Sequence, residues 1–252
     1  MATRSRRPLY MLSSFGVTQI LRQHPYMIAW WSAVFPGFGH FMLNQYIRGA
    51  LLTLSEVVIN SLARINESMV YSFCGQFQQA RDVLHPNWIY GYIAIYIFSI
   101  WDSYRSSLYV NKLSHLGELE NEAMVSVRIT PLELQYLEQR SPFSGVVASF
   151  FFPGLGQLYN QRFGLAFYGI LWWWIYSWLS QCYVSVLYLL LGRLQDSIQV
   201  LHPHWLLFMP SVLGGSMYHA YETAIAHNRL YRLEQRQFLT ERYSLSEVRI
   251  FP

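Results

Sequence analysis

Three polar side chains have the spacing for chemistry within an otherwise apolar stretch. Glu56, Asn60 and Arg64 recur every four residues in 47–65, so a helix places them on one face. A carboxylate near the middle of an apolar helix is costly and marks a functional or paired group. We expect a proton or cation site here, or a surface that recognises a polar partner helix. The alternatives are an internal pair of Glu56 with Arg64, or a helix end at which Glu56 reaches water.

A His-Pro-x-Trp motif occurs twice, and its two histidines could be a pair of metal ligands, with His204 as a third. The six residues are His85, Pro86, Trp88, His202, Pro203 and Trp205. Because no Cys or acid cluster lies at ligand spacing, we expect no metal. Proline at a first helical position and tryptophan as an anchor favour a helix start at an interface instead.

A proline–glycine motif also occurs twice and predicts a break in the apolar segment that holds it. Its residues are Pro36, Gly37, Gly39, Pro153, Gly154 and Gly156. Proline removes a backbone donor and glycine adds freedom, so a helix should stop or kink there. The motif is either a tight turn or, as in transporters with broken helices, an ion or substrate site at unwound backbone.

Both motifs recur at one offset, 117 residues, because the chain contains an internal duplication. Residues 25–113 align with 142–230 without a gap and share 21 identities in 89 positions. Such self-similarity predicts two copies of one structural unit. The expected parts are a basic N-terminal segment 1–24, membrane repeat 25–113, a cytoplasmic linker 114–141, membrane repeat 142–230 and a basic cytoplasmic tail 231–252.

The composition favours a membrane protein. Hydrophobic residues make up 53% of the 252 residues, aromatic residues 17% and charged residues only 13%. An average soluble domain has about 25% charged residues, and Trp and Tyr are typical of bilayer interfaces. The net charge of +4 is spread over separate segments and has no nucleic-acid signature. The sequence therefore predicts a lipid bilayer as partner, and no nucleic acid.

The apolar segments predict an all-α, polytopic integral membrane protein. Each repeat would hold a broken-helix hairpin, at 26–43 or 143–159, followed by two transmembrane helices. Lys and Arg gather at 1–24, 105–141 and 222–252, and they favour the cytoplasmic side. Each repeat then crosses an even number of times, with its broken segment re-entrant or interfacial. Six full crossings with inverted repeats are the alternative.

Two polar regions carry local signals for short helices. Val17, Ile20 and Leu21 have helical spacing in the basic first segment, which predicts an interfacial helix. In the linker, Thr130 is followed by a proline and then by Glu133, in the order of a capping box. That order predicts a helix start at Thr130.

The second copy of the proline–glycine motif resembles a known signature. The run from Phe152 to Asn160 contains Pro-Gly-x-Gly-Gln-x-Tyr-Asn, which is similar to the motif of small bacterial membrane proteins in the two-transmembrane-helix domain family. The first copy departs from it, with His40, Met42 and Leu43 in place of Gln, Tyr and Asn. The resemblance covers about ten residues per copy and implies topology, without implying an activity.

Together these features predict an integral membrane accessory subunit that docks partner membrane proteins. We expect it to be non-catalytic and without cofactor, because nothing resembles a nucleophile elbow, phosphate loop or dinucleotide fingerprint. The expected place is the bacterial plasma (inner) membrane, multi-pass, with both termini cytoplasmic. The alternatives are a small transporter or channel component using the Glu56 face and the helix breaks, or a membrane-embedded enzyme acting on lipid or cell-wall precursors.

Overall fold

A computed structural model describes residues 8–13, 15–20, 22–120 and 124–243. The first half of the chain contains β1 (Tyr10–Ser13), β2 (Gly16–Gln19), α1 (Pro25–Val34), α2 (Phe38–Met42), α3 (Tyr46–Ala63), α4 (Ile65–Phe73), α5 (Phe77–Val83) and α6 (Pro86–Glu120). The second half contains β3 (Val127–Ile129), β4 (Leu134–Tyr136), α7 (Pro142–Phe151), α8 (Leu155–Tyr159), α9 (Phe163–Ser180), α10 (Cys182–Leu190), α11 (Leu194–Val200), α12 (Pro203–Leu206) and α13 (Met209–Arg242).

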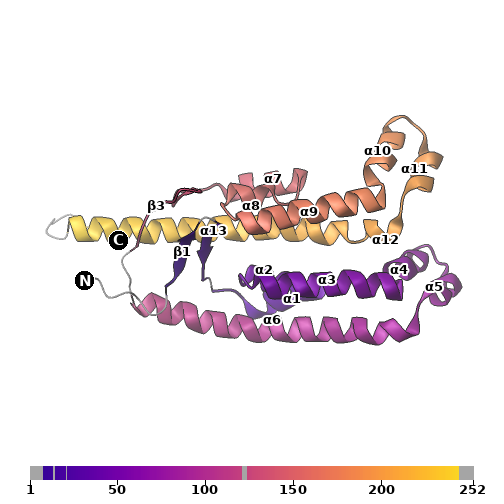
Figure 1. Cartoon of the computed structure of the whole chain (residues 1–252), viewed down its shortest axis with the longest axis horizontal. Coiled ribbons are helices and arrows are strands. Elements are labelled where there is room, and N and C mark those ends of the chain that lie inside the picture. Colours follow the sequence, from indigo (N-terminus) through magenta and orange to yellow (C-terminus); the bar gives the residue numbers. More distant parts are fainter. Residues whose placement is uncertain (1–7, 14, 21, 121–123, 244–252) are drawn as a thin grey trace.

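The molecule is elongated and has two layers, one for each copy (Figure 1). In one layer α1, α2 and α3 pack along the long helix α6, and in the other α7, α8 and α9 lie along α13. Equivalent hydrogen bonds hold both layers: the Gly37 N–H donates to Ser99 Oγ (2.9 Å), and the Gly154 N–H donates to Ser216 Oγ (3.2 Å). A core cluster that includes Phe35 and Tyr176 joins the two layers.

The proline–glycine motifs form the turn between two short helices in each layer. The first of these helices, α1 or α7, ends two residues before the proline. Gly37 and Gly154 then take φ values of 90° and 104°, which side chains with a Cβ rarely adopt. The turn lets α2 and α8 fold back and contact α3 and α9.

The basic N-terminal segment contains a β-hairpin, so the expected interfacial helix is wrong. β1 pairs with β2 antiparallel, and Gly16, the first residue of β2, has a φ of 116°. Val17 is buried with Leu12 in a small cluster, while Leu21 lies outside the described residues. Helical spacing of three apolar residues was too short a signal, because tertiary packing decides the state of such a segment.

The expected helix start at Thr130 is also wrong. Thr130 lies in the turn of a second hairpin, between β3 and β4. Its Oγ1 accepts a hydrogen bond from the Glu133 N–H at 3.1 Å. A helix cap uses the same local bond, and a Ser or Thr hydroxyl makes it equally well in a turn.

The expected polytopic membrane fold is wrong, because the lengths and hydropathies of the helices do not fit it. No helix in the described part of the chain combines the length and the hydropathy of a membrane-crossing segment. One cause is visible at 164–191, where Gln181 takes a φ of 56° and divides the apolar run into α9 and α10. The multi-pass topology, and with it the multi-pass placement in the bacterial plasma membrane, is therefore wrong. The two termini, which were expected to be cytoplasmic, lie outside the described residues.

Candidate functional site

Glu56 is buried on the inner side of α3. Its side chain is 1% exposed, and Oε1 accepts a hydrogen bond from Asn60 Nδ2 at 3.0 Å. Oε2 has no hydrogen-bond partner in the described part of the chain. Burial raises the pKa of Glu56 to about 7, against which the Asn60 bond acts only weakly. The carboxyl group can therefore hold a proton near neutral pH.

Arg64 does not join Glu56, although the two were spaced to share a face. α3 ends at Ala63, and Arg64 turns out of the helix with a φ of 56°. Its guanidinium forms an ion pair with Glu67 on α4. The internal pair of Glu56 with Arg64 is absent because the left-handed turn redirects the side chain.

Asn60 instead begins a polar chain that links the two layers. Its Nδ2 also donates to Asn66 Oδ1 at 3.0 Å, and its own Oδ1 accepts from the Asn66 N–H at 3.1 Å. Asn66 Nδ2 then donates to the carbonyl of His204 at 2.9 Å. The predicted polar face of α3 thus becomes a buried contact between the copies.

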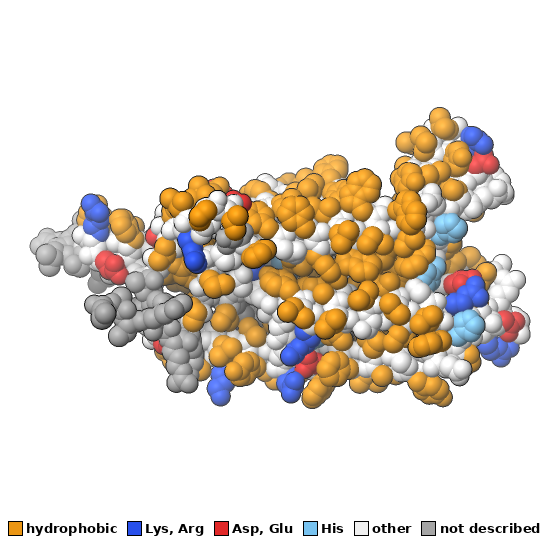
Figure 2. All heavy atoms as spheres, viewed as in Figure 1, with side chains coloured by type: hydrophobic (Ala, Val, Ile, Leu, Met, Phe, Trp, Pro, Cys, Tyr) orange, Lys and Arg blue, Asp and Glu red, His pale blue; other side chains and the backbone are white. Residues whose placement is uncertain are grey.

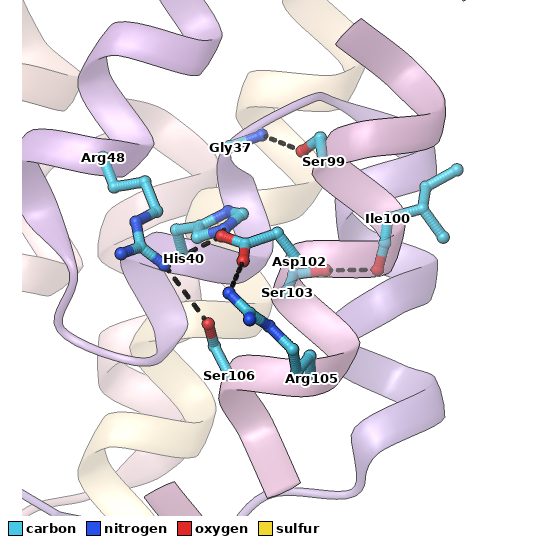
Figure 3. A network of polar contacts seen from close by, with 9 residues as sticks. All are labelled: Gly37, His40, Arg48, Ser99, Ile100, Asp102, Ser103, Arg105 and Ser106. Carbon is cyan, nitrogen blue, oxygen red and sulfur yellow. Dashed lines mark hydrogen bonds and ion pairs between the residues drawn. The ribbon is translucent and has the colours of Figure 1, made fainter. Parts of the chain in front are cut away.

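A second buried cluster, centred on Asp102, was not among the sequence candidates (Figure 3). Asp102 lies on α6 and contacts three basic side chains. Its Oδ2 accepts hydrogen bonds from Arg48 Nη1 at 2.8 Å and from His40 Nε2 at 3.1 Å. Its Oδ1 accepts one from Arg105 Nη2 at 2.8 Å. His40 is fully buried on α2, whereas the two arginines are about half exposed. An acid within the apolar run of α6 was the signal that could have revealed this cluster.

The protonation states of this cluster follow from burial and charge. Burial disfavours ionised Asp102, but the bonds from Arg105 and His40 and the charge of Arg48 outweigh it and hold its pKa below the usual value. Burial lowers the pKa of His40 more than Asp102 raises it, so the imidazole is neutral at pH 7. His40 Nε2–H then donates to the carboxylate, and Nδ1 has no partner among the described residues. With its ring fully enclosed, His40 anchors α2 to α6 through Asp102, and only the two arginines of the cluster reach solvent.

The histidine motifs lie where helices begin. The His85 N–H donates to the Ala63 carbonyl at 3.2 Å, and the His202 N–H donates to the Ser180 carbonyl at 2.9 Å. Pro86 opens α6 directly after the first motif histidine. Within the described ranges, no group of His, Cys, Asp and Glu is arranged to hold a metal ion. In each copy the motif therefore holds the start of one helix against the end of another: α6 against α3 in the first copy, and α12 against α9 in the second.

One cavity between the layers lies beside both proline–glycine turns and is small. It has a volume of about 60 Å³, and its lining combines aromatic side chains with four polar residues, which are Thr53, Gln157, Ser216 and His219. A single water molecule occupies about 30 Å³ in the liquid. The space is too small for an organic substrate, and Glu56 does not line it.

Comparison with known protein families, with curated proteins and with solved structures finds no match for this chain. The resemblance of the Phe152–Asn160 motif to the two-transmembrane-helix domain family therefore stays a prediction.

Replacing Asp102 with asparagine should lower the free energy of unfolding by about 2 kcal/mol. The reason is that His40, Arg48 and Arg105 would no longer donate their hydrogen bonds to a negatively charged carboxylate. Asp196→Asn is the control, since its pair with Arg193 is exposed on both sides and such pairs contribute about 0–1 kcal/mol. Thermal unfolding in mild detergent measures both changes. Equal effects of the two substitutions would contradict an anchoring role for the cluster.

Proposed function

We propose that the protein is a non-catalytic docking subunit that binds partner subunits through an exposed apolar surface. The observation that supports it is the position of large hydrophobic side chains on the outside of the helices. On α9 these residues recur at helical spacing, and more than half of each is exposed. They are Phe167, Leu171, Trp174 and Trp178.

The same surface continues over the other layer. We call the combined surface the apolar belt, and on α3 it contains Ile47, Leu51, Leu54, Val58 and Leu62. Figure 2 shows hydrophobic side chains over the middle of the molecule, with charged side chains concentrated toward its two ends and along one edge. Exposed apolar patches of this extent mark interaction surfaces in folded proteins.

The chemistry of the belt indicates what it binds. Residues 163–192 contain no Lys, Arg, Asp or Glu, so a partner there needs no compensating charge. Large aromatic side chains are also the residues that dominate binding energy in protein interfaces. Apolar helices of a partner subunit have the matching chemistry, because both surfaces lose contact with water when they meet.

A lipid bilayer is the second proposed partner. The belt extends over both α3 and α9, and a single docked helix would leave much of it uncovered. Acyl chains would cover the remainder without requiring polar contacts. The transporter and enzyme alternatives stay predictions.

Leu171→Arg should reduce capture of the partner subunit at least about tenfold, because a charge in a desolvated apolar contact is strongly unfavourable. The matched control is Leu132→Arg in the β3–β4 turn, which changes an equally large and 82% exposed side chain outside the belt. Co-purification in mild detergent, with partner stoichiometry from mass spectrometry, measures the effect.

Two outcomes would overturn the docking proposal: no stoichiometric partner, or equal capture by the two arginine variants. Flotation with phosphatidylcholine vesicles tests the lipid partner separately. Leu171→Arg should weaken flotation, while the unfolding temperature stays close to that of the unchanged protein. Flotation that is insensitive to Leu171→Arg but lost with Leu132→Arg would place lipid contact outside the belt.

A further inference from the structure

We propose that a groove between the start of α7 and the C-terminal half of α13 binds a phosphate-bearing anion. The groove has a volume of about 1020 Å³ and is open on one side. Arg140 lies on its α7 side, and Arg229, Arg232 and Arg236 lie along α13. Spacings of three and four residues place the three arginines of α13 on one face of the helix.

The charges of the groove are only partly neutralised. No carboxylate is among its lining residues in the described part of the chain. Outside the lining, Glu138 pairs with Arg140 at 2.9 Å, and Glu118 pairs with Arg229 at 3.0 Å. Arg232 forms no ion pair with any described carboxylate. Arg232 is therefore a positive charge at the groove that an anion would balance.

Arg140 gives an independent indication of a ligand. The residue lines the groove although it is only 4% exposed. Its Nε has no hydrogen-bond partner among the described residues. A buried guanidinium with an unused donor is costly, and an anion in the adjoining groove would compensate the charge of Arg140 at close range.

The N-terminus of α7 adds to the positive field. Ser141 and Pro142 begin this ten-residue helix at the groove, and its first turn has no acidic residue. Ser141 Oγ accepts from the Ser144 N–H at 3.3 Å, which satisfies one of the free donors. The helix dipole places a partial positive charge at the same end, where anions bind favourably.

The first copy lacks this arrangement at the equivalent positions. There, Arg22 occupies the region, bonding His115 Nδ1 at 2.8 Å and Glu118 Oε2 at 3.0 Å. The residues equivalent to the four arginines are Gln23, Lys112, His115 and Leu119. The excess of arginine is thus particular to the second copy, and the duplicated fold does not require it.

Phosphate is the anion that this chemistry fits best. Guanidinium groups bind phosphate through two parallel N–H···O bonds, which gives both geometry and affinity. The volume is at the upper end of small-molecule sites, so a phosphate with an attached sugar or glycerol fits. The same group occurs in soluble phosphate esters and in lipid headgroups.

Titration calorimetry of the full chain in mild detergent at low salt tests the site. One arm uses inorganic phosphate, and the other uses dihexanoyl phosphatidic acid below its micelle concentration. We expect saturation at one ligand per chain in at least one arm. Arg232→Gln should weaken that binding about tenfold, because it removes a charge-assisted contact. Arg242→Gln removes the same charge from the same helix outside the groove, and it should leave binding unchanged.

The two arms identify the source of the phosphate. Comparable affinity in both indicates a soluble phosphate ligand, whereas binding of the phosphatidic acid alone indicates a lipid headgroup. Absence of saturation in both arms would overturn the proposal, as would equal weakening by Arg232→Gln and Arg242→Gln. Because Leu171 and Arg232 are changed in different experiments, failure of the groove and failure of the docking belt are distinguishable.

Discussion

Gly156→Ala should lower the free energy of unfolding by about 3 kcal/mol or more, through overpacking at a contact between backbones. A Cβ at this position would lie 2.3 Å from the Gly145 carbonyl oxygen and 2.7 Å from Ala220 Cβ. Those atoms belong to α7 and α13, so relief requires α8 to move away from both helices. Thermal unfolding in mild detergent should show a large decrease in midpoint and in folded yield.

The control is Gly164→Ala, near the start of α9. Nothing lies within 4 Å of a Cβ built at this position. Alanine there should be neutral or should stabilise by up to about 1 kcal/mol, because glycine loses more backbone entropy on folding. A Gly156→Ala variant as stable as Gly164→Ala would show that α8 does not pack against α7 and α13 as closely as described.

The first layer depends on the same close approach. A Cβ at Gly39 would lie 2.4 Å from both the Ile28 carbonyl oxygen and Ser32 Oγ. The sequence alone predicted a break at each motif, because Gly37 and Gly154 recur at one offset and proline followed by glycine disfavours a continuous helix. It left open whether the break was a tight turn or a ligand site at unwound backbone. The break could be predicted in both copies because proline and glycine each act strongly on the local backbone.

The elements that could not be predicted depend on distant contacts. Val17 is buried against Leu12, and its N–H donates to the carbonyl of Gln161, far along the chain, at 3.1 Å. Thr130 makes the bond of a cap while standing in a hairpin turn. In both places the local pattern fits a helix equally well, and long-range packing decides the outcome.

The candidate site was predicted only in part for a similar reason. Glu56 and Asn60 share the helix turn that their spacing indicates, and the hydrogen bond between them is local. Arg64 does not lie on the same face because its own backbone is left-handed, and the spacing of the charged residues gives no sign of this. Asp102 and His40 are 62 positions apart, so only the folded contact between α2 and α6 joins them.

Glu56→Gln should remove a pH dependence of about 3 kcal/mol from the stability of the protein. Burial raises the pKa of Glu56 from 4.5 to about 7. Between those values the unfolded chain has lost the proton and the folded chain has kept it. Stability is therefore greatest below pH 4.5, declines as pH rises and is lowest above pH 7. Unfolding by denaturant at pH 4.5, 6 and 8 measures this decline.

Glutamine keeps the shape and can still accept from Asn60, but it never becomes an anion. At pH 8 Glu56→Gln should consequently be more stable than the unchanged protein, whereas near pH 4.5 the two should agree. Glu67→Gln is the control, because that carboxylate is partly exposed and pairs with Arg64. If Glu56→Gln instead destabilised the protein at pH 8, the buried carboxylate would have to be ionised and paired with a cation. That result would contradict the structure, in which Arg64 lies away from Glu56. A pH-independent stability difference would instead show that Glu56 titrates near its ordinary value and reaches water.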